Sequence, residues 1–129
     1  MSAMTTPLAF VIEDDEDLAT IFSKALQAAG CETEVISSGE KALERLAATV
    51  PFLVVLDLRL PGVTGQDILK HIKADPRLEE TRVIVATAHP RAGEELRRLA
   101  NLVLIKPVSF TQLRDLASRF VRANLPSGD

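Results

Sequence analysis

The stretch FLVVLDLRLPG, residues 52–62, decides how the rest of the chain is interpreted. An apolar run of strand length ends at a single acid, Asp57, and the turn-forming pair Pro61-Gly62 follows within a few residues. Such an uninterrupted run predicts a strand that is buried on both faces, as in a parallel sheet. Because an ionised carboxylate is costly inside such a layer, we expect Asp57 at the exit of the strand, where solvent or a cation reaches it. Ligands of open α/β sheets gather at this edge.

Composition limits the kinds of protein that the chain can be. Its 129 residues, 47% hydrophobic and 26% charged, fit one globular domain with a single core. A net charge of -3 argues against a general nucleic-acid binder. The one cysteine, Cys31, cannot form an internal disulfide, no apolar stretch is long enough to span a bilayer, and residues 1–7 lack the features of a signal peptide. We therefore expect a cytoplasmic protein that contacts neither nucleic acid nor membrane directly.

Apolar patterns alternate between strand and helix along the chain. Strands are predicted at residues 8–12, 33–36, 52–57, 82–86 and 102–105; helices are predicted at 18–29, 40–47, 65–74, 94–99 (a short piece) and 110–121. Ser37 with Glu40 and Ser109 with Gln112 are candidate capping boxes, and Phe110 is placed on the inward face of its helix. Five alternations predict an α/β fold, a doubly wound parallel sheet with helices on both faces and right-handed crossovers.

The residues at the strand exits form a candidate site. Glu13 and Asp14 follow the first strand, Asp57 ends the third, Thr87 follows the fourth and Lys106 follows the fifth. Parallel strands place their carboxyl ends on one edge, so these side chains should converge. Three neighbouring carboxylates repel one another, and oxygen-only ligands suit Mg²⁺. With Thr87 as a neutral donor and Lys106 as a positive charge, the set suits a phosphoryl group carried on Asp57 as an aspartyl phosphate.

In four motifs the chain resembles a bacterial two-component response-regulator receiver domain, over about residues 8–121. The motifs are VIEDD at residues 11–15, LDLRLPG at 56–62, ATA at 86–88 and KP at 106–107. Each is weak alone, and together, in this order and at these intervals, they are specific. The resemblance implies the flavodoxin-like strand order 2-1-3-4-5. It also implies a receiver domain at residues 8–124, a flexible N-terminal tail at 1–7 and a C-terminal tail at 125–129.

The resemblance implies a metal site and a phosphoryl site. Mg²⁺, with Mn²⁺ as an alternative, would be held directly by Asp14 and Asp57, through water by Glu13, and by the backbone carbonyl of Arg59.

For the phosphoryl group, the resemblance implies that Asp57 takes phosphate from a phosphohistidine on a sensor histidine kinase or a histidine phosphotransfer domain. Thr87 and Lys106 would bind the phosphoryl oxygens. The chain would then be a signalling phosphoacceptor that assists its own phosphorylation and dephosphorylation, and not an enzyme in the usual sense. The downstream protein partner is left open.

Two departures from the receiver pattern are visible. Val103 stands where receivers usually carry an aromatic residue three positions before the lysine, and the short interval from Thr87 to Lys106 predicts an abbreviated fourth helix. Near the site, we hypothesise that Arg59 and His89 adjust the lifetime of the phosphoryl group by limiting or orienting water.

Two alternative functions are weighed against the phosphoacceptor. One is a degenerate receiver that serves as a phosphorylation-independent docking module. The other is a haloacid-dehalogenase-like phosphatase, which would need a second acid two residues after the nucleophile, where this chain has Arg59. Whether the domain stands alone or belongs to a longer protein is also open.

Overall fold

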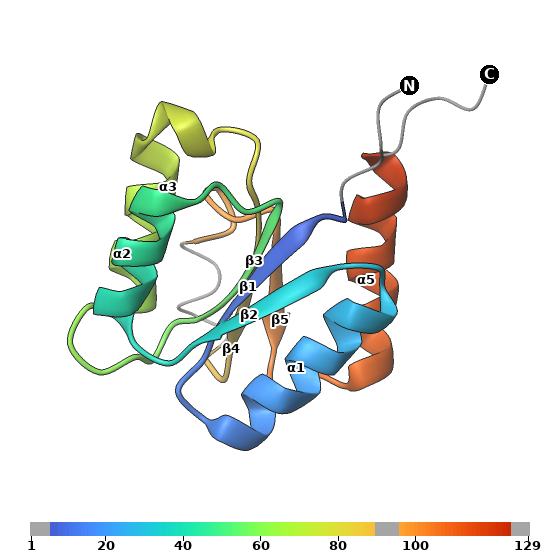
Figure 1. Cartoon of the computed structure of the whole chain (residues 1–129). Helices are drawn as coiled ribbons and strands as arrows, with labels where there is room; N and C mark the ends of the chain where they lie inside the picture. The colour runs from blue at the N-terminus through green and yellow to red at the C-terminus, as the bar shows by residue number, and fades with distance from the viewer. Residues whose placement is uncertain (1–5, 90–95, 125–129) are drawn as a thin grey trace, which may run out of the picture.

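The computed structural model describes residues 6–89 and 96–124, and these form one parallel sheet covered by helices on both faces (Figure 1). The five strands lie in the order β2-β1-β3-β4-β5, and every neighbouring pair is parallel. Their bounds are β1 Leu8–Ile12, β2 Glu32–Ile36, β3 Leu53–Asp57, β4 Arg82–Thr87 and β5 Leu102–Ile105. The predicted doubly wound sheet with the order 2-1-3-4-5 is confirmed.

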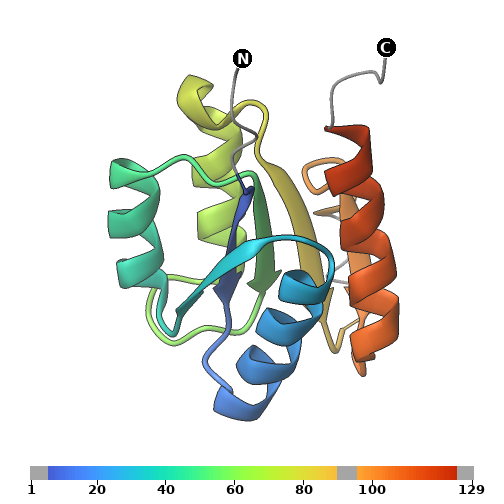
Figure 2. The same cartoon turned by 45° about the vertical axis from the view of Figure 1, so that its right-hand side comes forward.

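Two pairs of helices enclose the sheet (Figure 2). Helices α1 (Glu16–Ala28) and α5 (Phe110–Ala123) contact each other on one face, and α2 (Gly39–Ala48) and α3 (Gly65–Ala74) contact each other on the opposite face. A 3₁₀ turn, η1 (Pro76–Leu78), follows α3. Among the helices of residues 6–89 and 96–124, none is long and apolar enough to cross a bilayer.

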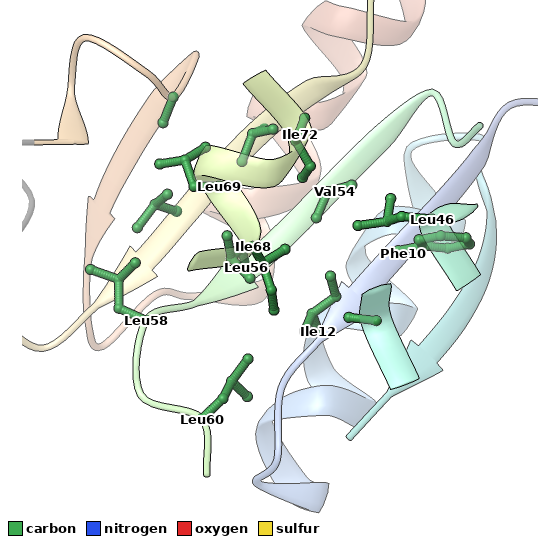
Figure 3. Close-up of a cluster of buried hydrophobic side chains, with 14 of the residues drawn as sticks. Phe10, Ile12, Leu46, Val54, Leu56, Leu58, Leu60, Ile68, Leu69 and Ile72 are labelled. Carbon is green, nitrogen blue, oxygen red and sulfur yellow. The ribbon is translucent and has the colours of Figure 1, made fainter. Parts of the chain in front are cut away.

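Successive side chains of the central strands point to opposite faces of the sheet and so contribute to both halves of the core. In β1, Phe10 and Ile12 pack with the α2–α3 side, whereas Ala9 and Val11 pack with the α1–α5 side. Strand β3 is buried along its whole length, as its uninterrupted apolar run predicts. Figure 3 shows the α2–α3 half of the core, which continues past the end of β3 into the chain that follows it.

The structure corrects two local predictions. The N-cap of α2 is Ser38 and not Ser37, because the Ser38 side chain accepts a hydrogen bond from the Lys41 backbone amide. Phe110, predicted to face inward, is 37% exposed at the first position of α5. Of the capping box predicted for α5, the Ser109 half is present, since its side chain accepts from the Gln112 amide, but the Gln112 side chain makes no return bond to the Ser109 amide.

Some predictions fall wholly or partly outside the described residues. Of the short helix predicted at residues 94–99, positions 94 and 95 lie outside them, as do 1–5 and 125–129 of the predicted tails. The bounds of the domain and its tails therefore stay predictions.

Candidate functional site

The carboxyl ends of β1 and β3 bring three acids together. These strands are neighbours, with Ile12 opposite Leu56, so the residues that follow Ile12 lie beside the last residue of β3, Asp57. One carboxylate oxygen from each of Glu13, Asp14 and Asp57 lies within 4.8 Å of the other two. The predicted convergence of the three acids is confirmed.

The cluster is buried on one side and open on the other. Glu13 is 2% exposed and Asp57 is 6% exposed, whereas Asp14 is an exposed residue. The backbone amide of Arg59 donates to Asp57 Oδ1 at 3.1 Å, and the amide of Asp15 donates to Glu13 Oε2 at 3.3 Å. These contacts orient both buried carboxylates while the edge of the cluster at Asp14 remains accessible.

Lys106 directly follows β5, and its side chain contacts both buried acids. Its Nζ donates to Glu13 Oε1 at 3.0 Å and lies 3.5 Å from Asp57 Oδ1. Burial and the nearby charge of Asp57 raise the pKa of Glu13 to about 7, although the hydrogen bond from Lys106 opposes this shift. Partial burial lowers the pKa of Lys106, but its contacts with Glu13 and Asp57 outweigh burial, so that pKa is raised overall. Lys106 is therefore a protonated, positively charged group at neutral pH.

Thr87 ends β4, the strand next to β3, and is 2% exposed. Its hydroxyl accepts from the backbone amide of His89 at 3.1 Å, and its carbonyl accepts from the Lys106 amide at 2.8 Å. The side chains of Arg59 and His89, each two residues beyond a strand end, contact each other through Nη2 and Nε2. A polar rim thus runs from the end of β3 across β4 to β5.

The donor set suits a hard cation and an anionic group together. Three carboxylates offer only oxygen ligands, and one ammonium leaves an excess of negative charge that a divalent ion such as Mg²⁺ would offset. The Asp57 carboxylate lies within reach of both the other two acids and the Lys106 ammonium, so a group bound to it would have positive charge nearby.

Sequence reasoning missed two features of this site. It assigned Lys106 to phosphoryl oxygens and did not anticipate its hydrogen bond to Glu13. It also assigned no role to Gly65, the first residue of α3, whose backbone packs against Asp57 and Leu58. Neither contact has a local sequence signal, because each joins residues that only the fold brings together.

Comparisons with known proteins agree with this geometry. The family model of the response regulator receiver domain matches residues 9–118. The phosphate regulon transcriptional regulatory protein PhoB of Rhizobium meliloti is 32% identical over 123 residues, which cover 93% of this chain and 54% of that protein. The polar-differentiation response regulator DivK of Brucella ovis is 34% identical over 92 residues, covering 71% of this chain and 75% of DivK.

Among solved structures, the response regulator DrrB, a Thermotoga maritima OmpR/PhoB homolog, superposes with a TM-score of 0.82 at 25% identity. The alignment covers 97% of this chain and 58% of DrrB. The chain spans about half (54%) of the length of the PhoB relative. With the profile match over most of its length, the chain belongs to the family of response regulator receiver domains.

Proposed function

We propose that Asp57 is the phosphoacceptor of this receiver domain and that it takes a phosphoryl group from a phosphohistidine. The observation that carries the proposal is the placement of the Asp57 carboxylate. It lies at the end of a buried strand, 3.5 Å from the Lys106 ammonium and within 4.8 Å of the Glu13 and Asp14 carboxylates.

The reaction is a transfer between two nucleophiles. An oxygen of the Asp57 carboxylate forms a bond to phosphorus, the bond between phosphorus and the donor imidazole nitrogen breaks, and the products are an acyl phosphate and a free histidine. Such transfers need mainly positioning and charge neutralisation. The amide of Arg59, which donates to Asp57 Oδ1 at 3.1 Å, orients the nucleophile and keeps its second oxygen available for attack.

Mg²⁺ is the ion we propose for the acidic cluster, with Mn²⁺ as the alternative. Asp14 and Asp57 would hold it directly, Glu13 through water, and Arg59 by its backbone carbonyl. When bound, the ion supplies positive charge for the phosphoryl oxygens.

Lys106, which contacts both Glu13 and Asp57, would supply a second positive charge. Its ammonium, now donating to Glu13, would turn to a phosphoryl oxygen, and the Thr87 hydroxyl would donate to another. Thr87 ends β4, the neighbour of β3, and the Lys106 ammonium already lies 3.5 Å from Asp57 Oδ1, so small side-chain rotations would be enough to reach the new group. Both residues would stabilise the charged product.

The proposal includes the setting of the domain. We propose a sensor histidine kinase or a histidine phosphotransfer domain as donor, a cytoplasmic location, and a domain at residues 8–124. The chain would act as a signalling phosphoacceptor that assists its own phosphorylation and dephosphorylation.

The two alternatives fit the site less well. A haloacid-dehalogenase-like phosphatase would need an acid at the position of Arg59, which carries the opposite charge. A degenerate docking module would not need a lysine paired with two buried acids.

Intact mass spectrometry tests the proposal. The full chain is incubated with Mg²⁺ and acetyl phosphate or phosphoramidate, and we expect one added phosphoryl group in the wild type and none in Asp57→Asn. Asp115→Asn, the same change at an exposed carboxylate of α5, should accept phosphate normally. A wild-type protein that never gains phosphate would instead support the docking module.

A further inference from the structure

The first turn of α3 touches the backbone that carries Asp57. Gly65, the first residue of α3, is buried, and a Cβ built on it would lie 2.4 Å from the carbonyl oxygen of Asp57 and 2.5 Å from Cα of Leu58. Both distances are shorter than real Cβ atoms show, and both opposing atoms belong to backbone, so no side chain can rotate away to make room. The absence of a side chain at Gly65 is what allows this contact.

Glycine is needed here for space and not for backbone conformation. Gly30 and Gly62 have positive φ values, whereas Gly65 does not. Alanine favours helix over glycine, so Gly65→Ala would stabilise α3 if the helix were considered alone. Any loss of stability or Mg²⁺ binding in Gly65→Ala must therefore come from displacement of the backbone at Asp57 and Leu58.

That segment has little room to yield. Leu58 and Leu60 are 5% and 7% exposed and belong to the core cluster that contains Ile68 of α3 (Figure 3). The amide of Gly65 donates to the Leu58 carbonyl at 3.1 Å. Arg59 lies between the two anchored leucines, and its amide donates to Asp57 Oδ1 at 3.1 Å. The core holds this short segment on one side, and the N-terminus of α3 holds it on the other.

We propose that Gly65 is a positioning residue for the metal and phosphoryl site. Because Gly65 has no side chain, its backbone can contact that of Asp57 and Leu58. This contact sets where the Asp57 carboxylate and the backbone of Arg59 lie relative to Glu13 and Asp14. A methyl group at position 65 moves the segment by several tenths of an ångström and separates ligands that must act together. The inference rests on the proposed function, because it concerns the same acidic site.

The test compares Gly65→Ala with Leu26→Ala in the full chain. Leu26 is fully buried in the α1–α5 half of the core, so its truncation lowers stability without touching the β3–α3 segment. Mg²⁺ binding is measured by titration calorimetry at a temperature where both variants are folded by circular dichroism. We expect Gly65→Ala to bind Mg²⁺ about tenfold or more weakly than the wild type, because the loss of residues that orient metal ligands lowers metal affinity by that order. Leu26→Ala should bind Mg²⁺ with wild-type affinity.

A second readout needs no metal. In EDTA, the backbone amide resonances of Leu58 and Arg59 should shift in Gly65→Ala and stay unchanged in Leu26→Ala. Wild-type Mg²⁺ affinity in folded Gly65→Ala, or an equal loss in Leu26→Ala, would overturn the inference. A wild-type chain that binds no Mg²⁺ and accepts no phosphate would instead refute the proposed function, so the two failures are distinguishable.

If Gly65→Ala does not fold, Thr64→Ala replaces it. Thr64 caps α3 by accepting from the Asp67 amide at 3.2 Å, so its removal loosens the same helix end without adding atoms. We expect weaker Mg²⁺ binding than in Leu26→Ala, and equal affinities in these two variants would contradict the positioning role.

Discussion

The buried carboxyl of Glu13 makes a quantitative prediction about stability and pH in the absence of metal. Burial and the charge of Asp57 raise its pKa from 4.5 to about 7 in the folded protein. Between these values the folded state keeps a proton that the unfolded chain has released, so the free energy of unfolding falls as the pH rises. The difference between 4.5 and about 7 corresponds to about 3 kcal/mol, most of it lost by neutral pH.

The assay is urea unfolding in EDTA at several values between about pH 5 and pH 8, where the raised pKa acts. Wild-type protein should lose up to about 3 kcal/mol across this range. Glu13→Gln should lose much less, because a neutral amide has no proton to release. Glu44→Gln, the same change at an exposed position of α2, should follow the wild type. Equal pH slopes for wild type and Glu13→Gln would refute the assignment of the buried proton to Glu13.

Three further predictions concern the metal, the rim and the core. Mg²⁺ should raise the melting temperature because it binds only the folded acidic cluster, and Asp57→Asn should reduce that rise; an unchanged Mg²⁺ response in this variant would count against the site. Arg59 and His89 contact each other beside the phosphoacceptor, so replacing either with Ala should admit water and speed the loss of phosphate, measured by mass after donor removal. Unchanged rates in both variants would exclude a role of this pair in the lifetime of the phosphoryl group. Leu46→Ala should lower the free energy of unfolding by about 2–5 kcal/mol in urea, since Leu46 is fully buried in the α2–α3 half of the core, and a loss below about 1 kcal/mol would contradict that packing.

Much of the fold could be predicted because the deciding signals are local. Apolar runs of strand length, alternating with helical patterns, specify a parallel sheet, and parallel strands place their exits on one edge. For that reason it could be predicted that Glu13, Asp14 and Asp57 share one edge of the sheet, whereas their being neighbours on that edge depends on the strand order. The strand order required the resemblance, since no local pattern states which strands are neighbours.

The parts that could not be predicted depend on three-dimensional fit. Two adjacent serines are equally good caps in sequence, and the geometry of the turn selects Ser38 over Ser37. Phe110 has the right spacing for an inward position, but at the first position of α5 its ring is partly exposed and lies under the guanidinium of Arg114. The contact of Gly65 with Asp57 depends on the angle at which α3 meets the sheet, which no spacing rule supplies.

The central claim is that a transferable phosphoryl group is carried on Asp57, and locating that group tests the claim most directly. Protein treated with Mg²⁺ and acetyl phosphate is reduced with borohydride, which converts an acyl phosphate of aspartate to homoserine, and peptides are then sequenced by mass spectrometry. We predict homoserine at position 57 and unmodified aspartate at Asp14 and Asp15. Homoserine at another aspartate, the corresponding alcohol (hydroxynorvaline) at a glutamate such as Glu13, or phosphate that resists borohydride and maps to a hydroxyl or histidine, would contradict the account.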